Sequence, residues 1–204
     1  MFCKLKHRRK SNTGRNGTKA ALQTSNQDLT LDFPFLHDWQ TKKLIRRSKV
    51  LFIIRGLPGS GKSTIVKAIT NTYCSSMVCS ADDYFLQDGK YNFDAAHLSE
   101  AHAACQNKAK DSCNRGMNVV VVDNTNVRRW EMKFYLELAH QRDYIVVLVQ
   151  PKTPWKWNPV ELAARNKHGV DVVTLKRKVN VMFTGLLQSF HSKLHKLFPN
   201  FQNY

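Results

Sequence analysis

Short apolar runs alternate with amphipathic segments along most of this chain. Mainly apolar runs occupy positions 51–54, 77–80, 119–122 and 144–149, and each has the length of a strand. Segments with apolar residues at helical spacing lie between them, over 94–114 for example, and around Trp130, Phe134 and Leu138, which we predict to be core positions. This alternation predicts an α/β fold with a doubly wound, mostly parallel sheet of four or five strands and helices on both faces.

The first apolar run ends in a glycine-rich octet that fits G-x-x-x-x-G-K-[ST] at every fixed position. Such a phosphate-binding P-loop points successive backbone N–H groups at phosphate oxygens, while its lysine reaches the β- and γ-phosphates and its hydroxyl can ligate Mg²⁺. A flexible loop is the alternative, but the preceding strand and following helix favour a P-loop NTPase. The predicted ATP-binding residues of the loop are Gly56, Leu57, Pro58, Gly59, Ser60, Gly61, Lys62, Ser63 and Thr64.

Polar residues also follow the next two predicted strands. Asp82 and Asp83 come after the second run, and Asp123 closes the third, ahead of Asn124-Thr125-Asn126. The carboxyl ends of parallel strands form the edge where open α/β sheets bind ligands. We therefore predict that Ser63 and Asp123 hold Mg²⁺ and that the amides after Asp123 orient substrate or metal-bound water. The alternative for Asp82 and Asp83 is a turn or helix cap, and the alternative for Asp123 is a core strand that ends in a turn aspartate.

The chain changes character after residue 150. A proline- and tryptophan-containing loop leads to a short helical segment with basic residues, including Arg165 and His168, which resembles a lid over ATP phosphates. Trp155 and Trp157 are expected either to stack on a base or to anchor the lid by apolar contact. A packing helix, or a bent pair, follows, with His191 and His195 on its solvated surface.

Composition adds a polyanionic partner to this picture. The 204 residues carry 32 Lys and Arg against 15 Asp and Glu, a formal net charge of +17, which favours nucleic acid ahead of acidic membrane. Five cysteines without C-x-x-C spacing indicate free, mostly buried thiols in a reducing compartment and no zinc site. No apolar run approaches membrane-spanning length.

We expect residues 1–30 to form a disordered basic tail and residues 31–200 to form the P-loop domain. The tail suits a mitochondrial presequence, a nuclear-localisation patch, an RNA-binding arm or, through Cys3, a palmitoylated contact with a membrane surface, as well as a tail with no dedicated role. The expected location is intracellular, with the cytoplasm favoured over mitochondrion and nucleus.

Taken in order, these motifs resemble the polynucleotide 5′-kinase branch of P-loop proteins. FPFL before the first strand, RGLPGSGKST and VQPKTPW are similar to the kinase-like domain of the 2′,3′-cyclic-nucleotide 3′-phosphodiesterases. DDYF, DGKYNF, DNTN, WEMK and the WKWN and ELAARNKHG segments are still more similar to the NEDD4-binding-protein-2-like proteins. The resemblance covers about four-fifths of the chain.

The resemblance implies roles for particular positions. Asp82 matches the general base that accepts the proton of an attacking 5′-hydroxyl, and Arg165 matches a lid arginine on the nucleotide phosphates. Asp123 matches the strand-end carboxylate near substrate and metal. Two positions depart from the family pattern, because Phe85 stands where phage-type kinases carry an acceptor-binding arginine and His168 takes the second basic lid position.

The sequence therefore predicts an ATP- and Mg²⁺-dependent polynucleotide 5′-hydroxyl kinase acting on RNA or DNA, with RNA favoured. Asp82, Lys62 and Arg165 are its expected catalytic residues. The alternative is an ATP-dependent nucleic-acid or partner-binding module with little turnover, and a small-molecule kinase is a more distant third. Cyclic phosphodiesterase activity is not expected, because it needs two facing H-x-[ST] motifs and the sequence offers His97-Leu98-Ser99 alone.

Overall fold

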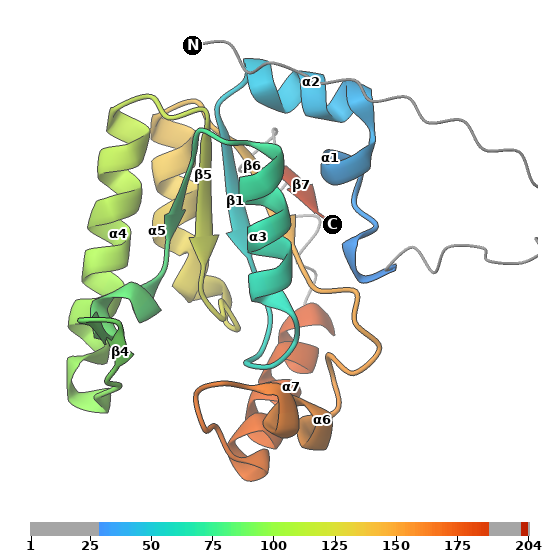
Figure 1. Cartoon of the computed structure of the whole chain (residues 1–204), viewed down its shortest axis with the longest axis vertical. Coiled ribbons are helices and arrows are strands. Elements are labelled where there is room, and N and C mark those ends of the chain that lie inside the picture. The colour runs from blue at the N-terminus through green and yellow to red at the C-terminus, as the bar shows by residue number, and fades with distance from the viewer. Residues whose placement is uncertain (1–28, 188–200, 204) are drawn as a thin grey trace, which may run out of the picture.

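The computed structural model describes residues 29–187 and 201–203, and within them it shows a parallel sheet flanked by helices (Figure 1). The spatial order of the strands is β2-β5-β1-β6-β7, with every neighbouring pair parallel. The strands are β1 (Val50–Ile54), β2 (Ser76–Cys79), β5 (Val119–Asp123), β6 (Ile145–Val149) and β7 (Phe201–Asn203). The predicted fold class is confirmed.

Strand β1 lies in the middle of the sheet and is buried along its whole length, because helices cover both faces. Leu51 and Ile53 pack toward α4 (Leu98–Asn114) and α5 (Arg129–Gln141). Val50, Phe52 and Ile54 pack toward the other layer, formed by α1 (Pro34–His37), α2 (Trp39–Arg47) and α3 (Lys62–Thr72). Side chains therefore alternate between two cores, as a doubly wound sheet requires.

The apolar segment before the first strand belongs to the second of these cores. Phe33 and Phe35 are fully buried and stack with ring centroids 5.0 Å apart. The Tyr73 hydroxyl donates a hydrogen bond to the Phe35 carbonyl at 2.6 Å. This contact joins the segment to the end of α3 and so fixes the helix that follows the P-loop.

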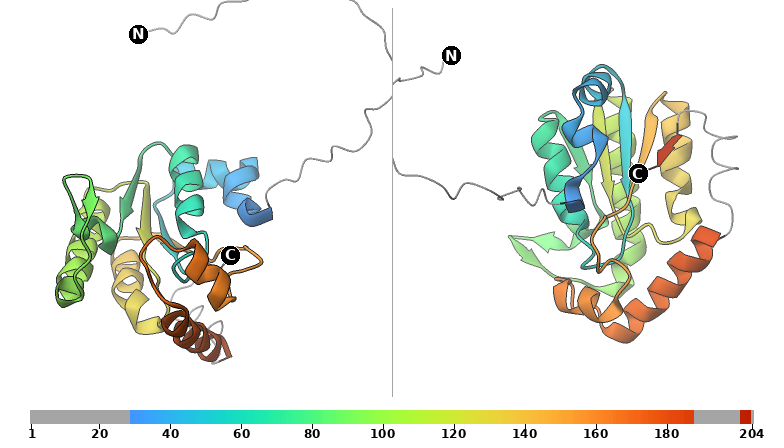
Figure 2. Two further views of the ribbon diagram at one scale, coloured as in Figure 1. Left: turned by 60° about the horizontal axis from the view of Figure 1, so that its bottom comes forward. Right: turned by 90° about the vertical axis from the view of Figure 1, so that its right-hand side faces the viewer.

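A third apolar cluster lies beyond the carboxyl ends of the strands. Helices α6 (Pro159–Arg165) and α7 (Val172–Leu187) lie across that end of the sheet (Figure 2). Leu162 and Leu175 from these helices are buried against Leu57 of the P-loop and Val127 from the loop after β5. The predicted lid is therefore packed directly on the nucleotide loop.

The structure corrects the predicted elements in two places. Trp130 is 67% exposed, so its prediction as a core residue was wrong; α5 turns Met132, Tyr135 and Leu136 inward instead. A small hairpin, β3 (Leu86–Gln87) and β4 (Lys90–Tyr91), was not predicted, because two-residue strands leave no periodic pattern.

Two further sequence predictions fall on residues outside 29–187 and 201–203. His191 and His195 lie outside the described residues, as does almost all of the predicted basic tail. Within the described ranges, the structure has no helix that combines the length and apolarity needed to span a bilayer.

Candidate active site

The P-loop leaves β1 and returns into α3 through two glycines with left-handed backbone, Gly59 at φ 79° and Gly61 at φ 98°. A Cβ on Gly59 would lie 2.4 Å from the Leu162 carbonyl oxygen of the lid, so only glycine fits. The Gly56 N–H donates to the Thr125 carbonyl at 3.0 Å, which fastens the start of the loop to the end of β5. The result is a backbone cradle held from two sides.

Lys62 begins α3 and reaches back across this cradle. Its Nζ donates to the Leu57 carbonyl at 3.2 Å. Burial lowers the pKa of the Lys62 ammonium, and the nearby carboxylates of Asp123 and Asp82 act in the opposite direction. A partly buried ammonium that faces a glycine-rich loop is well placed to meet phosphate charge.

Asp123 lies at the end of β5, opposite Lys62. Burial raises the pKa of its carboxyl group, while Lys62 opposes that rise. Its Oδ1 is buried and has no hydrogen-bond partner among the described residues. An unpaired, buried carboxylate oxygen is costly unless a ligand completes it, so the site fits a cation at this position.

The protein groups alone do not form a closed metal cage. Within residues 29–187 and 201–203, no three His, Cys, Asp or Glu side chains gather as a metal site. Ser63 and Thr64 are exposed on the first turn of α3. A carboxylate and a hydroxyl, with phosphate oxygens and water completing the set, suit Mg²⁺, which is normally held by few protein ligands.

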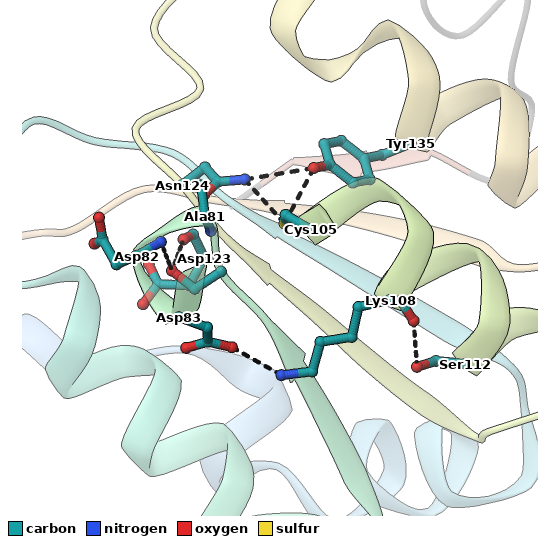
Figure 3. Close-up of polar contacts among 10 residues, drawn as sticks. Ala81, Asp82, Asp83, Cys105, Lys108, Ser112, Asp123, Asn124 and Tyr135 are labelled. Atoms are coloured by element: carbon teal, nitrogen blue, oxygen red, sulfur yellow. Dashed lines mark hydrogen bonds and ion pairs between the residues drawn. The ribbon is translucent and has the colours of Figure 1, made fainter. Parts of the chain in front are cut away.

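Asp82 lies in the 3₁₀ turn η2 (Ala81–Phe85), directly after β2. Ser80 caps this turn: its Oγ accepts from the Asp82 N–H at 3.2 Å and donates to the Asp123 carbonyl at 3.0 Å. The cap therefore ties the base predicted from the sequence to the strand that carries the predicted metal ligand. Figure 3 shows Asp82 and Asp123 side by side at this strand end.

Both carboxylate oxygens of Asp82 have neighbours. The Tyr91 hydroxyl donates to Oδ1 at 3.2 Å, and His168 Nε2 lies 3.7 Å from Oδ2. Burial raises the pKa of Tyr91 to about 12, with Asp82 adding to the effect, so this hydroxyl stays a donor. The adjacent Asp83 turns away and pairs with Lys108 at 2.7 Å (Figure 3).

The amides after Asp123 are structural, which corrects the prediction that they orient substrate or water. Asn124 accepts from the Ala81 N–H at 3.0 Å, and its Nδ2 lies 3.4 Å from Cys105 Sγ and Tyr135 OH (Figure 3). The Asn126 amide donates to the Ile54 carbonyl at 2.8 Å. Both side chains are buried and hold the strand ends in register.

Sequence reasoning missed Arg55, which is 1% exposed despite its charge. Its guanidinium donates to the Asn126 carbonyl at 2.9 Å and the Val127 carbonyl at 2.8 Å. Burial lowers the pKa of Arg55, and Glu131 opposes that effect. The available signal was an arginine interrupting an apolar run just before the P-loop.

The lid contacts the P-loop through the segment before α6. Thr153 Oγ1 donates to the Ser60 carbonyl at 2.9 Å, and the Trp155 indole N–H donates to the Gly59 carbonyl at 3.1 Å. Trp155 and Trp157 pack against the third apolar cluster, so in this structure both side chains anchor the lid by apolar contact.

Arg165 stacks its guanidinium over the Trp155 ring at 4.1 Å and pairs with Glu161 at 3.0 Å. It lies on the lid surface, one side chain away from the P-loop. Lys62, Asp82 and Asp123 instead interact with one another electrostatically. The structure thus brings three of the predicted site residues together and keeps Arg165 on the adjoining lid.

Comparison with known proteins agrees with this geometry. The family model described as an AAA domain, AAA_33, matches residues 51–182. Human NEDD4-binding protein 2 is 43% identical over 128 residues, 63% of this chain and 7% of that protein. Mouse 2′,3′-cyclic-nucleotide 3′-phosphodiesterase is 38% identical over 148 residues, 72% of this chain and 34% of that protein. The chain thus spans a minor part of these relatives.

Solved structures share the fold at low sequence identity. A chain of the Pnkp1/Rnl/Hen1 RNA repair complex superposes with a TM-score of 0.56 at 17% identity, over 69% of this chain and 46% of its own length. A chain of AvrRxo1-ORF1:-ORF2 with ATP gives 0.53 at 16% identity, over 79% and 56%. Because the family model matches residues 51–182, the range that contains the P-loop, the chain belongs to the AAA_33 family of P-loop kinase-like domains.

Proposed function

We propose that this chain is an ATP- and Mg²⁺-dependent kinase that phosphorylates a 5′-hydroxyl of RNA or DNA, with RNA the favoured acceptor. The observation that carries this proposal is that Ser80 joins Asp82 to Asp123 at the carboxyl end of the sheet, where both carboxylates oppose the lowering of the pKa of Lys62. A cation, a candidate base and a metal ligand beside one glycine-rich cradle are the parts that phosphoryl transfer needs.

The donor nucleotide would occupy the cradle of Gly56–Thr64. Backbone N–H groups and Lys62 would contact its phosphates, and Asp123 and Ser63 would hold Mg²⁺, which neutralises phosphate charge when bound. Arg165 would reach the phosphates by leaving Glu161, a half-exposed partner that holds it weakly. The contact between Trp155 and Gly59 would keep the lid on the loop meanwhile.

Asp82 would accept the proton of the attacking hydroxyl. Its Oδ1 receives the Tyr91 hydroxyl, which fixes the carboxylate and leaves Oδ2 to meet the acceptor once His168 moves aside. Asp82 is exposed, so an acceptor can reach it. General-base catalysis of this kind contributes about 10²- to 10⁴-fold in rate.

The choice of nucleic acid rests on charge and on relatives. A net charge of +17 favours a polyanionic acceptor over a nucleoside or sugar. One structural neighbour belongs to an RNA repair complex, and one relative is named for 2′,3′-cyclic nucleotides. These likenesses support a nucleic-acid acceptor and leave RNA and DNA to be separated by assay.

One observation favours the second candidate, an ATP-dependent binding module with little turnover. Both oxygens of Asp82 are already in contact with Tyr91 and His168. If His168 stayed in place when the acceptor bound, Asp82 could not accept the hydroxyl proton, and the chain would bind ATP without transferring phosphate.

The test is transfer of the γ-phosphate from labelled ATP to single-stranded RNA and DNA oligonucleotides that carry a 5′-hydroxyl. We expect a 5′-phosphorylated product with the wild-type chain and none with Lys62→Ala, because the phosphates lose their main cation. An oligonucleotide already phosphorylated at its 5′ end is the control. Tight ATP and RNA binding without product would overturn the kinase proposal and support the binding module.

A further inference from the structure

Aromatic side chains gather around the β3–β4 hairpin beside Asp82, contributed by η2, by β4 and by the segment after β4. Tyr84 and Tyr91 are each 37% exposed and Phe93 is 56% exposed, around a Phe85 that is 4% exposed. Phe85 contacts all three rings, with centroids 5.4 Å from Tyr84, 6.2 Å from Tyr91 and 5.1 Å from Phe93. The buried Phe85 ring thus supports three partly exposed aromatic rings on the surface.

Phe85 has a supporting role in this aromatic cluster. At the position where phage-type kinases carry an arginine, Phe85 is too buried to bind an acceptor directly. It instead packs into the core between the sheet and α4 and anchors the hairpin residues above it. The surface around Phe85 therefore offers aromatic rings, in place of the cation that an arginine at this position would provide.

These faces lie within reach of the reacting group. Tyr91 joins the aromatic cluster to Asp82 through its hydroxyl, at 3.2 Å. A 5′-terminal nucleoside separates its 5′-oxygen from its base by a single sugar ring. A hydroxyl placed on Asp82 therefore brings its base toward the aromatic cluster, in which Tyr91 contacts Asp82 and Phe93 packs against the same Phe85 ring as Tyr91.

Nucleobases are the ligand that fits such a surface beside a phosphate-binding site. Every base has a π-face, and base–aromatic stacking is tolerant of sequence. Tyr84 is committed to Glu100 through its hydroxyl at 2.6 Å, and one side of Tyr91 meets the His168 ring at 5.1 Å. Phe93 is therefore the ring with the most open face.

We infer that Phe93, which packs on Phe85 together with Tyr91, is a stacking site for the 5′-terminal base of a single-stranded nucleic-acid acceptor. This inference rests on the proposed function for the identity of the acceptor, and it assigns specificity to the base rather than to the adjoining phosphate. It predicts a preference for acceptors with an intact terminal base and tolerance of which base it is.

The test compares two single-stranded RNA oligonucleotides of one length, with the same phosphates and a 5′-hydroxyl. One has a normal 5′-terminal base and the other an abasic 5′-terminal ribose. Equilibrium binding to the full chain is followed by fluorescence anisotropy in the presence of ADP and Mg²⁺, and transfer from ATP is measured separately. We expect the wild-type chain to bind the intact oligonucleotide about tenfold more tightly, in line with one stacked base.

Phe93→Ala is expected to remove that preference by weakening binding of the intact oligonucleotide alone, and Phe93→Trp to retain it. Trp39→Ala is the matched control, because Trp39 is 64% exposed on α2, at the opposite end of the sheet from the hairpin (Figure 1). It should leave the preference unchanged. Thermal unfolding of each variant checks that the fold is intact.

Equal wild-type affinity for the two oligonucleotides, or an equal loss on both with Phe93→Ala, would overturn the inference. The two proposals fail separately in this design. Base preference without transfer would contradict the kinase and keep the stacking site, whereas transfer without base preference would do the reverse.

Discussion

Gly59 and Gly116 show how one residue type can serve two purposes. Both have left-handed backbone, at φ 79° and φ 72°. A Cβ on Gly59 would collide with the Leu162 carbonyl at 2.4 Å, whereas a Cβ on Gly116 would meet nothing within 4 Å. Gly116 is therefore required only by its backbone conformation, whereas Gly59 is required by both its conformation and the close approach of the lid.

Gly116→Ala is expected to cost about 1 kcal/mol of unfolding free energy from backbone strain alone. Gly59→Ala should cost more and should also abolish ATP binding, because the cradle and α6 must move apart. Urea unfolding and ATP titration of both variants measure these effects. Equal costs for the two, with ATP binding intact in Gly59→Ala, would show that the lid contact is unimportant.

Residues at the site differ in how well the sequence predicted them. Lys62 and the glycines follow from a fixed spacing whose chemistry is local. Asn124 and Asn126 do not, because their partners are 43 and 72 positions away, in the turn η2 and on strand β1. The predicted role of such an amide depends on which backbone groups the fold brings near it, and that is not visible in a motif.

At the scale of elements, Arg55 connects the end of β1 to the loop between β5 and α5. Its two hydrogen bonds reach carbonyls 71 and 72 positions away. Together with the Gly56–Thr125 bond, they set the position of the P-loop relative to Asp123. A buried cation at this junction is a positioning device for the site.

Replacing Arg55 with Met should lower the unfolding free energy by about 3 kcal/mol, because two buried carbonyls would lose their donors. Arg115→Met is the control, since Arg115 is exposed at the end of α4. Chemical denaturation measures both. A loss below 1 kcal/mol for Arg55→Met would contradict the structural role given to this residue.

Elements with strong periodicity were predicted, and the small β3–β4 hairpin was not. Four strands, β1, β2, β5 and β6, and three helices, α3, α4 and α5, correspond to apolar runs and helical spacing in the sequence. The β3–β4 hairpin depends instead on aromatic contacts with Phe85, an interaction between neighbouring elements. Trp130 was misplaced because an exposed aromatic at helical spacing cannot be distinguished from a buried one without the fold.

At the scale of the whole molecule, the buried thiols of the described residues lie on one face of the sheet. Cys79, Cys105 and Cys113 lie in the core formed with α4 and α5, and Cys74 is exposed. Burial raises the pKa of Cys79 to about 12 and that of Cys113 to about 11, and it also raises the pKa of Cys105. Raised values keep these groups as unreactive thiols at neutral pH.

Iodoacetamide at pH 8 should therefore label Cys74 in the folded chain and leave Cys79, Cys105 and Cys113 unmodified until urea exposes them. Peptide mass spectrometry locates the label. Labelling of the buried thiols before unfolding would mean that the α4 side of the core opens, contrary to the packing described.

The most direct test of Asp82 as the general base of the proposed kinase compares Asp82→Asn with Asp83→Asn. These neighbours differ in that Asp82 faces Tyr91 and His168, whereas Asp83 pairs with Lys108. ATP binding and phosphate transfer to a 5′-hydroxyl RNA oligonucleotide are measured for both variants and for the wild-type chain. We predict that Asp82→Asn loses transfer by about 10²- to 10⁴-fold with ATP binding unchanged, and that Asp83→Asn keeps both. Transfer by Asp82→Asn at the wild-type rate would contradict the assignment of the base and, with it, the proposed mechanism.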